Sequence, residues 1–194
     1  MEQSRVIPID VLNKFAIAGR MLEIEELKRG HINRTYVATW GDGSRRKRYV
    51  HQVVNHRIFR DIDALMSNLD LVTAQLQTSK TAGQLRDDEV TLTLVRTADD
   101  RTYLEDEQGE YWRTFEYIEG TTTYDVCPSV DVACEAAAIL GRFQRCLLGL
   151  DPSRVRDTIP FFHHGGKRFE AFEVAVEEDT QARKKLCGAE ISFA

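Results

Sequence analysis

The sequence predicts an α+β fold in which an antiparallel sheet carrying one helix is followed by a segment of helices. Apolar residues alternate with a period of two in most segments before residue 118, and they recur every three or four residues after residue 129. An Asp42-Gly43 turn between two β-rich segments indicates a hairpin. The pattern changes near Gly120, so we expect one domain over residues 1–120 and a second over residues 121–194.

The predicted sheet domain begins with a short helix and three strands. Residues 9–19 form the expected helix, and Gly19 suits the position after its last turn. The strands are expected over residues 21–28, 31–40 and 47–54 because β-favouring residues are concentrated there.

The clearest helix of the chain comes next. Its apolar residues are separated by three or four positions and lie on one face: Ile58, Ile62, Leu65, Leu69, Val72 and Leu76. A strand over residues 89–97 and a hairpin of residues 102–105 and 111–118 around Gln108-Gly109 complete the expected sheet.

Two helices are predicted after the joint at Gly120, over residues 129–149 and from Arg168 to about Lys185. The second helix should direct Phe169, Phe172 and Val176 inward, and Asp179 and Arg183 are four residues apart on it, a spacing at which they can pair. The first should bury one side of the helix: Ala133, Ala136, Ala137, Leu140, Phe143 and Leu147.

Composition and charge argue against several classes of function. The formal net charge of −5 argues against nucleic-acid binding, and the basic run Arg45–Arg48 is expected at a solvated hairpin tip. No apolar run is long enough to span a membrane, and no secretory signal is visible, so we expect a cytoplasmic protein without membrane partners. The four cysteines form no CxxC pair, and the adjacent His163 and His164 lack ligand spacing, so no metal site is predicted.

Five short segments stand in a specific order along the chain. They are Lys28–Tyr36 between the first two strands, Tyr49–Phe59 in the third strand and its exit, Tyr111–Gly120 before the joint, Leu140–Gln144 in the next helix, and Thr158–His163 with Arg168 beyond it. Together they resemble the aminoglycoside phosphotransferase-like kinases, specifically the N-acetylhexosamine 1-kinase branch. The resemblance implies a protein-kinase-like small lobe, with a five-stranded antiparallel sheet and one helix, followed by the first helices of a large lobe.

The resemblance also implies a nucleotide site for ATP. Gly30 and His31 would stand where kinases carry their glycine-rich loop, and Asn33 and Thr35 would add polar donors to the phosphates. For Gly30 the alternative is an ordinary hairpin turn.

Two further segments complete the implied nucleotide site. Gln52 occupies the place of the third-strand lysine, and Glu116, Tyr117 and Ile118 form the adenine hinge. The aromatic residue Phe115 or Tyr117 would line the adenine pocket, although both also fit an ordinary sheet core.

Three features depart from or extend the family pattern. Val53 follows Gln52 where the branch often has a basic residue, and the helix after the third strand lacks the glutamate that pairs with that strand. Asp63 or Asn68 would have to replace the glutamate, or both are simply solvated. Arg168 would reach substrate or phosphate, with a structural ion pair as the alternative.

The family's catalytic carboxylate is missing from this sequence. No His-x-Asp-x(4)-Asn loop occurs, so no catalytic residue and no Mg²⁺ ligand is assigned, and both are expected beyond residue 194. We therefore expect the N-terminal part of a longer kinase that is inactive alone, whose C-terminal helices carry unpartnered apolar faces that favour self-association.

Several functions remain open from the sequence. The first is an ATP-dependent kinase for the anomeric hydroxyl of N-acetylglucosamine or N-acetylgalactosamine. Aminoglycoside, choline or homoserine are alternative acceptors for the same lobe. A non-catalytic, pseudokinase-like nucleotide-binding or interaction module is a different class of function. An unrelated α+β protein is the last alternative, and it predicts no cleft between residues 29–35 and 116–118.

Overall fold

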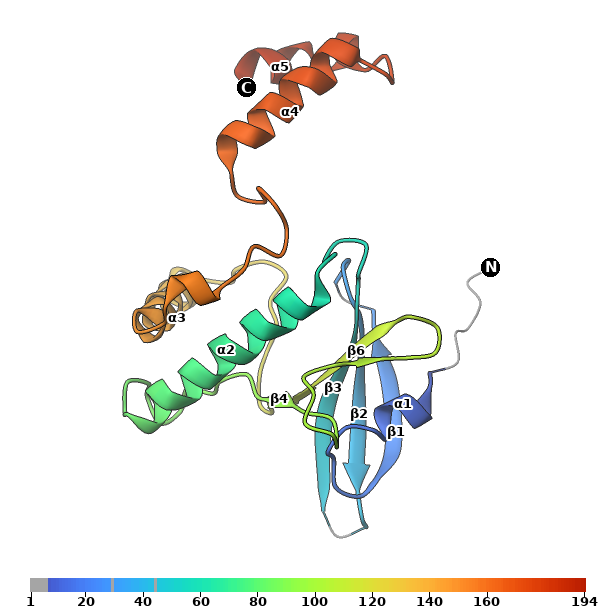
Figure 1. Cartoon of the computed structure of the whole chain (residues 1–194). Helices are drawn as coiled ribbons and strands as arrows, with labels where there is room; N and C mark the ends of the chain where they lie inside the picture. The colour runs from blue at the N-terminus through green and yellow to red at the C-terminus, as the bar shows by residue number, and fades with distance from the viewer. Residues whose placement is uncertain (1–6, 29, 44) are drawn as a thin grey trace. The chain divides into compact units, whose positions relative to one another are not determined.

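The computed structural model describes residues 7–28, 30–43 and 45–194 and is shown in Figure 1. The chain separates into two compact units, which divide between Thr158 and Ile159, and each is described by itself. The elements of the first unit are α1 (Ile9–Leu12), β1 (Arg20–Leu27), β2 (Arg34–Gly41), β3 (Arg46–Val54), α2 (Ile62–Thr81), β4 (Leu94–Val95), β5 (Leu104–Glu105), β6 (Tyr111–Glu116), α3 (Val130–Leu147) and the 3₁₀ turn η1 (Pro152–Arg154). The second unit holds α4 (Gly165–Glu178), η2 (Lys184–Leu186) and α5 (Gly188–Phe193).

The strands form one antiparallel sheet in the order β1-β2-β3-β6-β4, and the short β5 pairs with β6. This arrangement confirms the predicted α+β fold with an antiparallel sheet and one helix after the third strand. The predicted joint at Gly120 lies inside the first unit, where that residue has a φ of +70° just after β6. The division into lobes of residues 1–120 and 121–194 stays a prediction.

Two predicted elements are shorter in the structure because tertiary pairing competes with them. Helix α1 ends at Leu12 rather than at residue 19, because the backbone of residues 14–16 pairs with residues 96–98. The N–H of Ala16 donates to the carbonyl of Arg96 at 2.9 Å, and the N–H of Ala98 donates to the carbonyl of Lys14 at 2.8 Å.

Strand β4 keeps only Leu94–Val95 of the predicted residues 89–97. The preceding residues are held by α2 instead, because Gln77 donates to the hydroxyl of Thr91 at 2.6 Å and Lys80 donates to the carbonyl of Glu89 at 2.9 Å.

The sheet is covered on both faces, as Figure 1 shows with α1 and α2 on opposite sides. One face packs against the N-terminal segment, where Leu12 and Phe15 contact aromatic residues of the sheet such as Tyr36, Trp40 and Trp112. On the other face, α2 buries Ile62 and Met66 against Val54 at the end of β3, together with half-buried Tyr111 of β6. The remainder of that second face is formed by residues of β2, β3 and β6.

A neutral histidine lies inside the first of these cores. His51 of β3 is fully buried, its Nε2 accepts the indole N–H of Trp40 at 3.3 Å, and its Nδ1 lies 2.8 Å from the hydroxyl of Thr114. Because Nε2 accepts, the proton of the neutral ring belongs on Nδ1 and is donated to Thr114. Burial lowers the pKa of His51 to about 4, so the ring is uncharged at neutral pH.

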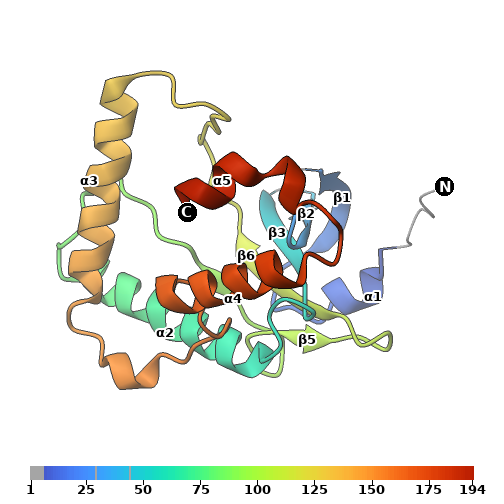
Figure 2. The same ribbon diagram turned by 90° about the horizontal axis from the view of Figure 1, so that it is seen from above.

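Helix α3 crosses α2 and contacts it near its own C-terminal end, and Figures 1 and 2 show the two helices running in different directions. Gln75 and Ser79 of α2 donate to the carbonyl of Cys146, at 3.0 Å and 3.4 Å, and Cys146 is the buried residue of α3. The inward direction predicted for most of this face is wrong, because Ala133, Ala136, Ala137, Leu140 and Phe143 are exposed, whereas Leu147 is half-buried. Within this unit, α3 therefore presents exposed apolar residues such as Ile139 and Leu140.

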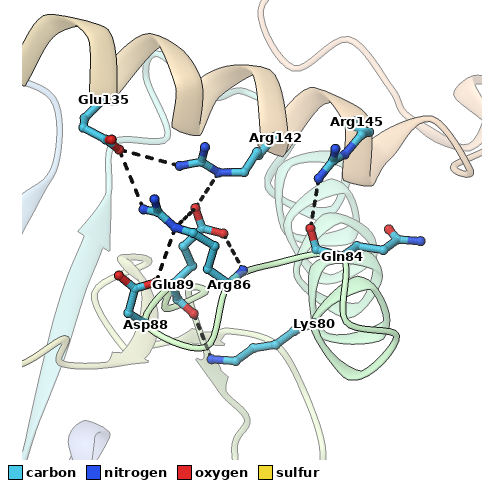
Figure 3. Close-up of polar contacts among 8 residues, drawn as sticks. All are labelled: Lys80, Gln84, Arg86, Asp88, Glu89, Glu135, Arg142 and Arg145. Atoms are coloured by element: carbon cyan, nitrogen blue, oxygen red, sulfur yellow. Dashed lines mark hydrogen bonds and ion pairs between the residues drawn. The ribbon is translucent and has the colours of Figure 1, made fainter.

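The contact between α3 and the segment after α2 is made by charged groups, which Figure 3 shows. Arg142 of α3 pairs with Glu89 at 2.5 Å, and Arg86 lies 3.4 Å from the same carboxylate oxygen. Glu135 lies 3.7 Å from Arg86 and 3.8 Å from Arg142. The backbone N–H of Arg86, and then Arg142 itself, lower the pKa of Glu89. These ion pairs therefore hold one side of α3 against the segment after α2. The apolar pattern of the helix did not predict that this side makes the contact.

The second unit is a helical hairpin described by itself. Helix α4 begins at Gly165, three residues before the predicted start, because the His164 ring accepts the N–H of Lys167 at 3.2 Å as a cap. Asp179 ends the helix with a φ of +40°, and its carboxylate accepts the N–H of Lys184 at 3.0 Å. The predicted pair of Asp179 with Arg183 is therefore wrong. Phe172 and Val176 line a hollow with Cys187 and Ile191, in agreement with their predicted inward direction, whereas Phe169 is exposed.

Within the described part of the chain, no helix combines the length and the apolar character that a membrane span requires.

Candidate functional site

The sheet face opposite α1 carries two neighbouring rows of side chains. Thr35, Gln52 and Arg113 are register partners on β2, β3 and β6 and form a polar row. The next row toward the hinge is apolar, because two residues further along the strands place Val37, Val50 and Phe115 in register. We call these six residues the site face.

Gln52 is hydrogen bonded to both other residues of the polar row. Its amide nitrogen donates to the hydroxyl of Thr35 at 3.2 Å, and its carbonyl oxygen accepts from Nε and Nη2 of Arg113 at 3.0 and 2.9 Å. Helix α2 contributes Met66, whose sulfur lies 4.0 Å from Nη1 of the same arginine. The amide group therefore has one defined orientation, with its oxygen toward the guanidinium.

Arg113 is a half-buried cation on this face. Burial lowers the pKa of Arg113 to about 10, so the guanidinium remains charged at neutral pH. Among the residues that the structure describes, no carboxylate lies within ion-pair distance of it, and its partners are the amide of Gln52, the sulfur of Met66 and the ring of Phe115 at 5.3 Å. The sequence analysis did not select this arginine, although it interrupts the apolar series Tyr111, Phe115 and Tyr117 on one side of the strand.

The predicted glycine turn lies next to the polar row. Gly30 has a φ of +96°, a conformation that favours glycine, and His31 beside it is exposed. Asn33 uses its side-chain oxygen to accept the N–H of Asn55 at 3.0 Å, which ties the turn to the end of β3. Arg29, which belongs to the same segment, lies outside the described residues. The phosphate contacts of Gly30, His31 and Asn33 stay predictions.

The predicted hinge leaves the sheet at the other end of the site face. The N–H of Glu116 donates to the carbonyl of Thr93 at 3.0 Å, and the N–H of Tyr117 donates to the carbonyl of Arg48 at 3.1 Å. The Arg48 guanidinium lies 3.9 Å from the centre of the Tyr117 ring.

Ion pairs fix the hinge to β3. Lys47 pairs with Glu116, and Nε of Arg48 donates to Glu119 at 2.9 Å. The bond from Arg48 lowers the pKa of Glu119. Two residues of the basic run, Lys47 and Arg48, are thus paired with carboxylates. A contact of Glu116, Tyr117 and Ile118 with adenine stays a prediction.

Neither predicted replacement for the helix glutamate faces Gln52. Asp63 accepts the phenol O–H of Tyr103 at 2.7 Å, and burial together with this carboxylate raises the pKa of Tyr103 to about 12. Asn68 accepts the N–H of Arg156 at 3.0 Å and donates to its carbonyl at 2.7 Å. Neither side chain replaces the glutamate, because both bond to loops, and the exposed position of Asp63 agrees with the alternative of a solvated residue. The side chain of α2 that meets the polar row is the uncharged Met66.

Arg168 belongs to the second unit and is described within it. Its Nη1 donates to the carbonyl of Phe162 at 3.1 Å, so it holds the loop before α4. A contact with substrate stays a prediction. The search of the described residues finds no group of three His, Cys, Asp or Glu residues placed to hold a metal ion.

No family model matches the sequence. Among solved structures, the chain is similar to an aminoglycoside phosphotransferase from Alicyclobacillus acidocaldarius subsp. acidocaldarius DSM 446, with a TM-score of 0.52, 15% identity, and coverage of 91% of this chain and 46% of that one. A spectinomycin phosphotransferase in complex with ADP and spectinomycin matches with a TM-score of 0.38 and 9% identity, over 61% of this chain and 31% of that one.

The chain spans about half the length of the first of these structures, 46%. The first likeness establishes the fold. The alternative of an unrelated α+β protein, which predicts no cleft between residues 29–35 and 116–118, stays a prediction. The sheet and helix of this chain have the kinase-like small-lobe fold of an aminoglycoside phosphotransferase.

Proposed function

We propose that this chain forms the nucleotide-binding lobe of an ATP-dependent phosphotransferase that acts on a hydroxyl group of a small molecule. The observation that carries the proposal is the site face, where an apolar row and a row with an uncompensated cation lie between a glycine turn and the hinge. The similarity to a phosphotransferase fold supports the same reaction class.

The chemistry of a nucleotide matches this order of groups. An adenine ring is flat and largely apolar, and it would lie against the half-buried Val50, beside the buried Val37 and Phe115, with its edge toward the backbone of residues 116–118. The phosphates would extend along the strands toward Thr35, Gln52 and the turn at Gly30, where backbone N–H groups and side-chain donors approach anions closely.

This chain's own residues would bind and orient the nucleotide. Mg²⁺ bound to the phosphates would neutralise their charge during transfer. The sequence holds no His-x-Asp-x(4)-Asn loop, so the base for the acceptor hydroxyl is assigned to no residue of this chain. We therefore expect binding of ATP without turnover by this chain alone.

The acceptor proposed from the sequence resemblance is the anomeric hydroxyl of an N-acetylhexosamine. Aminoglycosides, choline and homoserine stay alternative acceptors, and the neighbouring solved structure is an aminoglycoside phosphotransferase. A cytoplasmic location and self-association through exposed apolar residues of α3, such as Ile139 and Leu140, belong to the same proposal.

A non-catalytic nucleotide-binding module is the second candidate. One observation favours it, because α2 places the thioether of Met66 beside the polar row, where an active kinase has a glutamate. Both candidates predict nucleotide binding at the site face, and they differ in whether the whole protein transfers phosphate.

A charge on the apolar row tests the proposed site. We expect Val50→Glu to weaken binding of a fluorescent ATP analogue by at least about tenfold, because the carboxylate disfavours both adenine packing and the nearby phosphates. The measurement is a fluorescence titration with competition by unlabelled ATP. The matched control is Leu22→Glu, which adds the same charge at an exposed position of β1 and should leave binding unchanged.

Either of two results would contradict the proposed function. Wild-type protein without saturable binding would exclude the nucleotide lobe. Equal affinity of Val50→Glu and wild type, both folded by circular dichroism, would place the nucleotide elsewhere.

A further inference from the structure

We infer that Arg113 supplies the positive charge that binds the phosphates of a nucleoside di- or triphosphate, in place of a lysine on β3. This inference rests on the proposed function and assigns the charged phosphate ligand within that site. Strand β3 carries Gln52 at the position that was expected to contact phosphate, and an amide has no net charge. The neighbouring strand β6 provides the cation at the register partner of Gln52.

The hydrogen bonds of Arg113 leave it able to bind an anion. A guanidinium has five N–H donors, and two of them, from Nε and Nη2, are directed at the single oxygen of Gln52. Nη1 lies beside the sulfur of Met66 at 4.0 Å, and a thioether is a weak acceptor. The guanidinium is thus oriented by neutral groups that do not compensate its charge.

Other half-buried arginines of the same unit give a useful contrast. Arg34 pairs with Glu110 at 2.9 Å, Arg96 with Asp70 at 2.6 Å, and Arg142 with Glu89 at 2.5 Å. Arg113, although half-buried, has no such carboxylate among the described residues. A half-buried charge without a counter-ion destabilises the fold, and an anionic ligand would relieve this cost.

Gln52 acts as the positioning residue of this pair. It connects Arg113 to Thr35, the second residue of β2, which follows the turn at Gly30. The cation is therefore held two strands away from the turn that was predicted to contact phosphate. Binding a phosphate here would need no rearrangement of the sheet, because the amide already fixes the guanidinium.

A purely structural role makes a different prediction. If Arg113 served only to bond Gln52, its removal would change stability without changing which part of a nucleotide is recognised. The test therefore compares ligands that share the adenosine group and differ in their phosphates.

Titration calorimetry of the full chain with adenosine, AMP and ADP tests the inference. We expect Arg113→Gln to weaken ADP binding by about tenfold to a hundredfold, the loss of one or two charge-assisted hydrogen bonds, while adenosine affinity stays within about twofold. Arg113→Lys should restore part of the preference for ADP. Arg101→Gln removes the same charge from an exposed pair with Asp99 and should leave the ratio of ADP to adenosine affinity unchanged.

Two results overturn the inference, and they are distinguishable. A wild-type ratio of ADP to adenosine affinity in Arg113→Gln would exclude Arg113 while leaving the nucleotide site in place. No binding of either ligand by wild type would exclude the proposed function as well. If Arg113→Gln does not fold, the side-chain Nε–H signal of Arg113 in wild-type protein replaces the variant: a shift with ADP and none with adenosine supports the inference, and no shift with ADP overturns it.

Discussion

Leu12→Ala is expected to lower the free energy of unfolding by about 2–5 kcal/mol, the usual cost of emptying a fully buried leucine site. Leu12 has no exposed surface and packs with Phe15 against Tyr36, Trp40 and Trp112. The N-terminal segment therefore completes the core on the sheet face opposite the site face, and the loss should be large although α1 is only one turn long.

Urea unfolding followed by circular dichroism measures this loss. Ile9→Ala is the matched control, because Ile9 lies in the same helix and is 49% exposed. We expect the control to change stability by less than about 0.5 kcal/mol. Equal losses in the two variants would show that α1 does not complete the core in solution.

Acid should destabilise the protein through His51. Burial lowers the pKa of His51 to about 4 in the folded chain, compared with 6.5 for an unperturbed imidazole. The neutral ring is therefore the form that folding favours. This contribution to stability is fully present above pH 6.5 and is lost as the pH falls toward the folded pKa of about 4. The full difference corresponds to about 3 kcal/mol.

The comparison of two variants isolates this effect from the titration of carboxylates. His51→Gln keeps a polar side chain between Trp40 and Thr114 and cannot gain a proton in this range. Between pH 7.5 and 4.5, wild type should lose about 2–3 kcal/mol more unfolding free energy than His51→Gln. His31→Gln, at an exposed position, should behave as wild type. A parallel pH dependence in wild type and His51→Gln would refute the buried neutral ring.

The periodicity of apolar residues predicts those elements whose positions depend mainly on their own sequence. The strands around the Asp42-Gly43 turn and the long helix α2 lie near their predicted positions, because β-favouring residues are concentrated in the strands and apolar residues recur every three or four positions in the helix. The ends of α1 and β4 were not predictable in this way. They depend on backbone pairing between residues 14–16 and 96–98, which are far apart in the sequence.

The face of α3 shows where an apolar pattern misleads. Its apolar residues were expected inside, whereas the contact with the rest of the unit is made by Arg142 and Cys146. The apolar pattern of α3 cannot predict contacts that are made by an ion pair and a backbone carbonyl. The groups that α3 contacts in this way lie at positions 75–89 of the chain.

The candidate site was predicted in part. Gln52 and Thr35 were selected and are hydrogen bonded to each other, whereas Arg113 was missed. The reason is register, since only the pairing of β3 with β6 brings Arg113 beside Gln52. The absent helix glutamate was noticed in the sequence, but the side chain that stands nearby, Met66, could not be named without the packing of α2.

The central claim is that a nucleotide binds the site face of the sheet. Amide chemical-shift mapping of the isotope-labelled chain with ADP tests it most directly. We expect saturable shifts at Thr35, Val50, Gln52, Arg113 and Ile118, and none at Leu12 or Trp40 on the opposite face. Saturable shifts confined to the opposite face, or no shifts at all, would contradict it.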